Sequence, residues 1–137
     1  MATRQTHDTQ ATNLDGRVMQ PPFIIPIRTL RGMNDREHPM SRHRRVKREK
    51  TQVGWELKAW SMKNPKPPIP CVVRLTRLGP STGLDDDNLA GALKSVRDAI
   101  ADWLQINDRH AHLVRYQCAQ AYSPAWGVQI EFGDPYD

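Results

Sequence analysis

The strongest pattern in this sequence is a stripe of apolar residues with the spacing of an α-helix. The residues recur at intervals of three or four positions, and they are Leu89, Leu93, Val96, Ile100 and Leu104. On a helix these positions lie along one side, so the pattern predicts an amphipathic helix over residues 89–104. Packing of the apolar side, more than intrinsic propensity, stabilises such a helix in a protein. The rest of the chain must therefore supply a partner surface.

A second helical stripe lies earlier in the chain. It falls at steps of seven, four and three residues and consists of Val46, Val53, Leu57 and Trp60. The helix is expected to begin at Pro39, which suits a first-turn position, or with Ser41 as its N-cap. It should end before Asn64, because the prolines that follow cannot continue a helix.

Short apolar and β-branched runs predict four strands. They cover residues 23–30, 69–78, 111–122 and 125–132. Pro26 makes the first an edge strand or a bulge, since proline has no N–H for a ladder. The last two are expected to form an antiparallel hairpin around Ser123 and Pro124. The order β-α-β-α-β-β predicts an α+β fold, with a mixed or mostly antiparallel sheet and two helices packed on one face.

The 137 residues are enough for one domain, expected over residues 21–137. Residues 1–20 are polar without an apolar period, which predicts a flexible N-terminal tail. No apolar run approaches the roughly 20 residues that a membrane span needs, and no secretory signal is visible. Cys71 and Cys118 lie in apolar runs and are expected to be reduced thiols, which favours a cytoplasmic protein.

The net charge of +5 is unevenly distributed along the chain. Residues 31–50 hold eight Lys or Arg against three acids, whereas residues 84–108 hold six Asp against two basic residues. A basic helix beside an acidic cluster suggests that one binds phosphates and the other binds metal. The alternative is a solvated helix surface. The candidates for contact with a DNA backbone are Arg42, Arg44, Arg45, Lys47, Arg48 and Lys50.

Three consecutive acids precede the helix at residues 89–104. Asp85 and Asp87 form an Asp-x-Asp pair whose side chains can reach one cation, and hard cations such as Mg²⁺ prefer such oxygen ligands. Asp87 or Asn88 would cap the helix, and Asn88 would also orient a carboxylate. The alternative is a solvated cap without metal. Asp108 follows the helix, which is about 24 Å long, so it can meet the cluster only if the helix is shorter or if a partner subunit supplies it.

The run Leu84-Asp85-Asp86-Asp87-Asn88-Leu89, followed by Trp103-Leu104 and then Asp108, resembles the RusA-type Holliday junction resolvases over residues 22–133. The resemblance implies a RusA-like homodimer that binds four-way DNA junctions. It also implies paired symmetrical nicks that use Mg²⁺ or Mn²⁺, in DNA recombination and repair in a bacterial or phage-infected cell. The family's catalytic and metal-binding aspartates correspond to Asp85, Asp87 and Asp108.

One position departs from that family pattern. Gly91 occupies the place where the family usually has a lysine, three residues after the asparagine. Lys94 lies seven residues after Asp87, about two helical turns, and is expected to replace it in stabilising phosphate charge. The alternative function is a non-catalytic dimeric DNA-binding module of the same fold. A nuclease for other branched or flap substrates would differ only in what it cuts.

Overall fold

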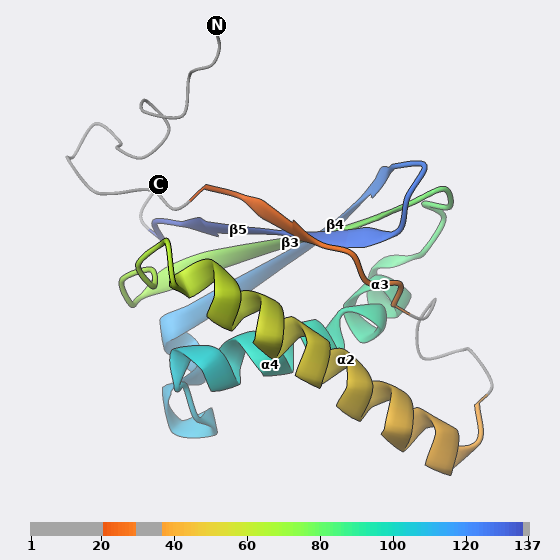
Figure 1. Cartoon of the computed structure of the whole chain (residues 1–137), viewed down its shortest axis with the longest axis horizontal. Coiled ribbons are helices and arrows are strands. Elements are labelled where there is room, and N and C mark those ends of the chain that lie inside the picture. The colour runs from red at the N-terminus through yellow and green to blue at the C-terminus, as the bar shows by residue number, and fades with distance from the viewer. Residues whose placement is uncertain (1–20, 30–36, 136–137) are drawn as a thin grey trace, which may run out of the picture.

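The computed structural model describes residues 21–29 and 37–135 as a mixed sheet with helices against it (Figure 1). The predicted tail at residues 1–20 lies outside this part. The elements are β2 (Phe23–Ile25), α2 (Pro39–Ser61), β3 (Cys71–Gly79), α3 (Asp86–Ala92), α4 (Lys94–Leu104), the 3₁₀ helix η1 (Asp108–Leu113), β4 (Val114–Tyr122) and β5 (Gly127–Gly133). The predicted α+β class is confirmed. No helix among the described residues is long and apolar enough to cross a membrane.

The four strands form one sheet in the order β2-β5-β3-β4. β3 pairs with β4 in parallel, and β5 runs antiparallel to both β3 and β2. The prediction of a mixed sheet is therefore correct, but the predicted final hairpin is wrong, because β3 lies between β4 and β5. Parallel strands need a long crossover, and the helical segment between β3 and β4 supplies it. β5 then pairs with the free edge of β3.

The core lies between the sheet and the two long helices. Alternate residues of β3 are buried, because successive side chains of a strand point to opposite faces. On the helix side these residues meet apolar side chains of α2 and α4, which pack on the same face of the sheet (Figure 1). The fully buried members include Val53, Leu57, Val73, Leu75, Val96 and Ile100.

Aromatic side chains close one end of this core. Phe23 stacks on Trp60 with ring centroids 4.8 Å apart, and Phe132 packs against Trp60 and Trp103 at 5.6 and 5.7 Å. Phe132 pairs with Val73 near the start of β3. The cluster therefore anchors the end of the sheet opposite to the loop that carries the acids, and Trp60 packs against the core as its helical stripe predicted.

The predicted helix over residues 89–104 is broken in two. Leu93, with φ −99° and ψ 5°, separates α3 from α4. Gly91 precedes the break, and glycine costs a helix about 1 kcal/mol relative to alanine. Leu93 is nevertheless fully buried, so the apolar stripe still faces the core. The N-cap prediction is also wrong, because Asp85 and not Asp87 or Asn88 caps the helix.

The strand expected over residues 23–30 is similarly shorter, and β2 ends at Ile25 just before Pro26. The expected strand over residues 111–122 begins only at Val114, after η1. The start of α2 matches the prediction, with Pro39 in its first turn and the His38 side chain accepting from the Met40 N–H.

Burial of Cys71 predicts a loss of stability in alkali. Burial raises the pKa of this thiol to about 11 from an ordinary value of 9.0. Above pH 9 the unfolded chain loses the proton and the native state keeps it, so the free energy of unfolding should fall by roughly 2–3 kcal/mol between pH 9 and pH 11. Urea unfolding across this range measures the fall. Cys71→Ala should flatten it, and equal slopes for the two proteins would contradict the assignment.

Candidate functional site

The acidic cluster lies on a loop that β4 fixes in place. The side chain of Gln120 binds the main chain of Leu84 twice: its Nε2 donates to the Leu84 carbonyl at 2.6 Å, and its Oε1 accepts from the Leu84 N–H at 3.3 Å. Asp85 follows directly with an extended backbone, φ −74° and ψ 173°. The loop therefore enters α3 in one orientation even though it lies at the surface.

The three carboxylates of this cluster are exposed to solvent. Asp85 Oδ1 accepts a hydrogen bond from the Asn88 main-chain N–H at 2.9 Å, so Asn88 orients this carboxylate through its backbone. Within residues 21–29 and 37–135, the carboxylates of Asp86 and Asp87 have no ion pair or hydrogen bond, and the Asp85 carboxylate has only its cap bond. No basic side chain in the described part of the chain pairs with this cluster.

Asp108 and Lys94 are not brought to this cluster. The backbone of Asp108 begins η1, at the opposite end of α4 from α3 (Figure 1), and α4 alone is about 16 Å long. The ammonium group of Lys94 binds Asp98 one turn further along α4, at 2.9 Å. Among the described side chains, no group of three or more His, Cys, Asp or Glu is arranged to hold a metal ion. Asp85 and Asp87 remain as a pair of possible ligands.

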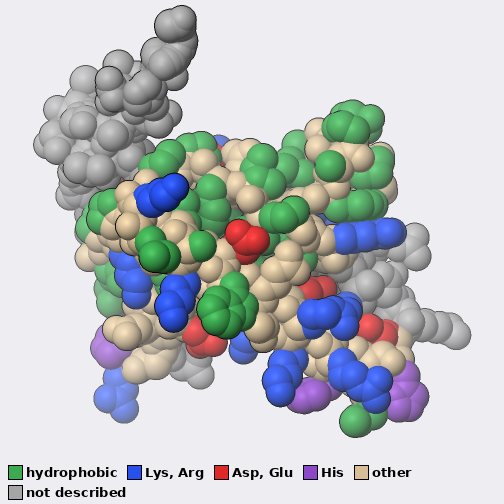
Figure 2. Space-filling model, in the orientation of Figure 1, with side chains coloured by type: hydrophobic (Ala, Val, Ile, Leu, Met, Phe, Trp, Pro, Cys, Tyr) green, Lys and Arg blue, Asp and Glu red, His purple; other side chains and the backbone are tan. Residues whose placement is uncertain are grey.

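The basic residues of α2 divide into two groups. Lys and Arg side chains gather over the N-terminal half of the helix (Figure 2). Arg45 lies 3.2 Å from Glu37 and 3.1 Å from Glu49, and Lys50 lies 3.8 Å from Asp102. Arg42 is more exposed and contacts Glu37 at 3.8 Å. Of the six predicted DNA-contact residues, those without ionic partners in the described part of the chain are Arg44, Lys47 and Arg48.

These three residues form the outer basic stripe of α2. They line a shallow groove along the helix together with Trp55, whose side chain is 67% exposed. Because Trp55 lies within three turns of Arg44 on one helix side, the stripe combines positive charge with an aromatic surface. The sequence analysis gave all six basic residues the same predicted role, because the sequence does not show which of them form ion pairs with carboxylates.

A buried carboxylate links α2 to α4. Glu49 is only 4% exposed. It accepts hydrogen bonds from Ser95 Oγ on one oxygen and from Arg45 Nη1 at 3.1 Å on the other. A buried charge is costly unless it is paired and hydrogen-bonded, and both conditions are met here. Glu49 lies within the most basic segment of the sequence, so the sequence gave no indication that its side chain is buried.

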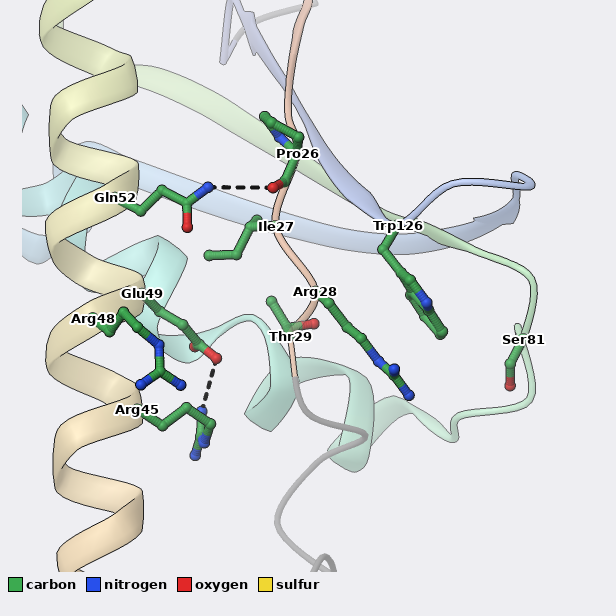
Figure 3. A pocket seen from close by; sticks show the side chains of 10 residues that line it. All are labelled: Pro26, Ile27, Arg28, Thr29, Arg45, Arg48, Glu49, Gln52, Ser81 and Trp126. Atoms are coloured by element: carbon green, nitrogen blue, oxygen red, sulfur yellow. Dashed lines mark hydrogen bonds and ion pairs between the residues drawn. The ribbon is translucent and has the colours of Figure 1, made fainter.

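A second feature that the sequence did not reveal is a cavity beside Trp126. It has a volume of about 680 Å³. α2 forms one wall, with Arg45, Arg48, Glu49 and Gln52, and residues 26–29 with Trp126 form the opposite wall (Figure 3). Two residues in the sequence could have indicated this cavity: Trp126, after the Ser123-Pro124 turn, and Arg28, shortly after Pro26.

The Trp126 ring is held by contacts on several sides. A Cβ atom at Gly79 would overlap the ring, so glycine permits the ring to lie directly on the end of β3. The guanidinium carbons of Arg28 and Arg77 lie 4.6 and 4.9 Å from the ring centroid. Arg77 is buried, and its Nε donates to Thr29 Oγ1 at 3.2 Å. Contacts within the protein therefore hold this wall of the cavity in position without a ligand.

No protein family model, curated protein or solved structure matches this chain. The resemblance to the RusA-type resolvases therefore rests on the motif residues alone.

Substitution of Gly79 should disturb the Trp126 wall. Gly79→Ala places a methyl group inside the ring, and overpacking of this kind costs about 1–3 kcal/mol. Urea unfolding should show that loss, with a change in tryptophan fluorescence of the folded protein. Gly83→Ala is the matched control, since a Cβ there meets nothing within 4 Å. Equal stability of the two variants would show that the ring does not pack on β3 in this way.

Proposed function

We propose that this chain is a metal-dependent, structure-selective endodeoxyribonuclease that nicks four-way DNA junctions in pairs, in recombination and repair. The observation that carries the proposal is the exposed pair Asp85 and Asp87, without a basic partner in the described part of the chain, on a loop that Gln120 fixes. The motif resemblance supplies the substrate class.

The donor set fits Mg²⁺ or Mn²⁺. Adjacent carboxylates repel one another, and a divalent cation relieves that repulsion. Mg²⁺ is commonly held by one or two carboxylates and completes its shell with waters, so Asp85 and Asp87 would suffice to hold it. A bound ion of this kind lowers the pKa of a water and polarises a phosphate. The Asn88 N–H contributes by keeping the Asp85 carboxylate in a fixed orientation.

The third family carboxylate requires a second copy of the chain. Asp108 begins η1 at the end of α4 away from α3. Within one subunit, the length of α4 therefore separates Asp108 from the acidic cluster. A homodimer in which the partner contributes this residue is therefore part of the proposal. Two identical sites in a two-fold dimer would also suit a substrate that is cut symmetrically.

The outer basic stripe of α2 would bind the DNA backbone. Arg44, Lys47 and Arg48 are exposed and carry no ionic partner among the described residues. Their charges are available to phosphates, which dominate the affinity of proteins for DNA. Such an enzyme would work in the cytoplasm of a bacterial or phage-infected cell.

One observation favours a second candidate function. Lys94, the expected replacement for the family lysine, binds Asp98 on the side away from α3. A site without a lysine beside its acids would lack one means of offsetting charge on the scissile phosphate. The second candidate is therefore a dimeric DNA-binding module of the same fold that does not cleave.

Removal of one carboxylate distinguishes the two candidates. Asp87→Asn should lower the rate of nicking of a labelled four-way junction at least about 100-fold, because it removes a direct metal ligand. The assay compares Mg²⁺ with EDTA, and junction with linear duplex of the same sequence. Asp86→Asn removes the same charge from the same cluster and should keep most of the activity. Junction binding without metal-dependent nicks by the native protein would favour the binding module.

The two groups of basic residues on α2 should respond differently to substitution. The double variant Arg44→Gln with Lys47→Gln should reduce the slope of log affinity against log salt by about 2, since each lost phosphate contact removes about one. Arg45→Gln should instead lower the free energy of unfolding, because it leaves buried Glu49 without its ion pair. Fluorescence anisotropy and urea unfolding measure the two effects. An unchanged slope in the double variant would remove the stripe from the DNA contact.

A further inference from the structure

We propose that the cavity beside Trp126 is a phosphate subsite, which holds the backbone of a DNA strand a few nucleotides from the acidic cluster. The assignment of the strand to DNA rests on the proposed function. The affinity of the cavity for a phosphodiester rests on the contacts described below.

The size and construction of the cavity suit a ligand. Its volume of about 680 Å³ lies within the range of roughly 300–1,000 Å³ that is usual for ligand sites. Four separate segments line it: α2, residues 26–29, Ser81 before α3, and Trp126 after β4 (Figure 3). The Gln52 side chain donates to the Pro26 carbonyl at 3.2 Å and joins two of these walls.

The net charge of the lining is positive. Arg45 has two carboxylate partners, Glu37 and Glu49, so its charge is offset. Glu49 in turn has both oxygens bonded. That leaves Arg28 and Arg48, which have no carboxylate partner in the part of the chain that the structure describes. Two such arginines in one cavity attract an anion.

Arg28 is oriented to bind a phosphate. Its guanidinium carbon lies 4.6 Å from the centroid of the Trp126 ring, and its N–H donors have no hydrogen bond or ion pair within the described residues. Arginine binds phosphates through such paired N–H donors. Because the Trp126 ring packs on Gly79, this side of the cavity has a fixed surface, and its ordering costs little on binding.

Arg48 connects the cavity to the outer basic stripe. It lines both the cavity and the groove that holds Arg44 and Lys47. The groove and the cavity therefore share Arg48, and positive charge extends from the outside of α2 into the cavity. A small free anion needs only one end of this path, whereas an extended polyanion can follow all of it. The path favours a phosphodiester chain.

The cavity lies close to the acidic cluster along the chain. Ser81 lines the cavity and Asp85 begins the cluster, so their Cα atoms are at most about 14 Å apart. A strand of duplex DNA rises about 3.4 Å per nucleotide. A strand with one phosphate at the acids would thus place another in the cavity within about four nucleotides.

The test uses the full chain in EDTA, where binding is measured without cleavage. A labelled four-way junction is titrated over a salt series with the native protein, Arg48→Gln, and the double variant Arg28→Gln with Arg48→Gln. The double variant should bind about tenfold more weakly, with a salt slope lower by about 1–2. Arg48→Gln alone should show part of the loss, and it leaves the Trp126 stack in place. Arg115→Gln is the control, because this residue pairs with Val72 and lies on the opposite face of the sheet.

A second measurement locates the site. Thymidine monophosphate and a short thymidine oligonucleotide are titrated while the indole N–H signal of Trp126 is followed by NMR. Both should shift the signal, the oligonucleotide at lower concentration, and the double variant should abolish both shifts. Absence of a shift, or an unchanged salt slope in the double variant, would overturn the subsite. Equal affinity for the monophosphate and the oligonucleotide would overturn the path for an extended strand.

These results separate the subsite from the proposed function. If the native protein nicks junctions but the double variant binds them normally, the subsite is wrong and the nuclease proposal stands. If the native protein does not nick and the double variant still loses affinity, the subsite stands and the nuclease proposal fails.

Discussion

The burial of alternate β3 side chains against α2 and α4 is the interaction on which the rest of this structure depends. β3 is an inner strand of the sheet, with β4 parallel on one edge and β5 antiparallel on the other. One end of β3 lies near the aromatic cluster of Phe23, Trp60 and Phe132. The other end, at Gly79, supports Trp126 and leads into the loop of the acids. The two ends of one strand thus carry a stabilising cluster and the candidate site.

Local patterns were sufficient for most elements of the fold. The helical stripes located α2 and the α3–α4 region, and Pro39 marked the start of α2. Pairing between strands was not predictable in the same way, because an alternating pattern indicates a strand but not which strand it pairs with. The last two strands looked like a hairpin, yet the long helical crossover allows β4 to pair in parallel with β3. The break at Leu93 was missed because the buried stripe continues through it.

Only the part of the candidate site whose residues are adjacent in the chain was predictable from the sequence. Three consecutive acids are visible in the sequence, and the structure leaves them exposed on a fixed loop. The partners of basic side chains come from other elements, as with Lys50 and Asp102, so their charges could not be judged beforehand. The cavity was missed for the same reason, since its walls come from four segments that are distant in the chain.

The position of β5 has a consequence for the order in which this protein is made. β5 is the last strand among the described residues, yet it lies between β2, which is the first of them, and β3. Until residues 127–133 leave the ribosome, β2 lacks the only partner strand that it has in the described part of the chain, and one edge of β3 stays open. Unpaired strand edges are sites of association between chains. Between the synthesis of β3 and that of β5, the nascent protein therefore exposes an edge of each of β2 and β3, and the pairing of β5 covers both.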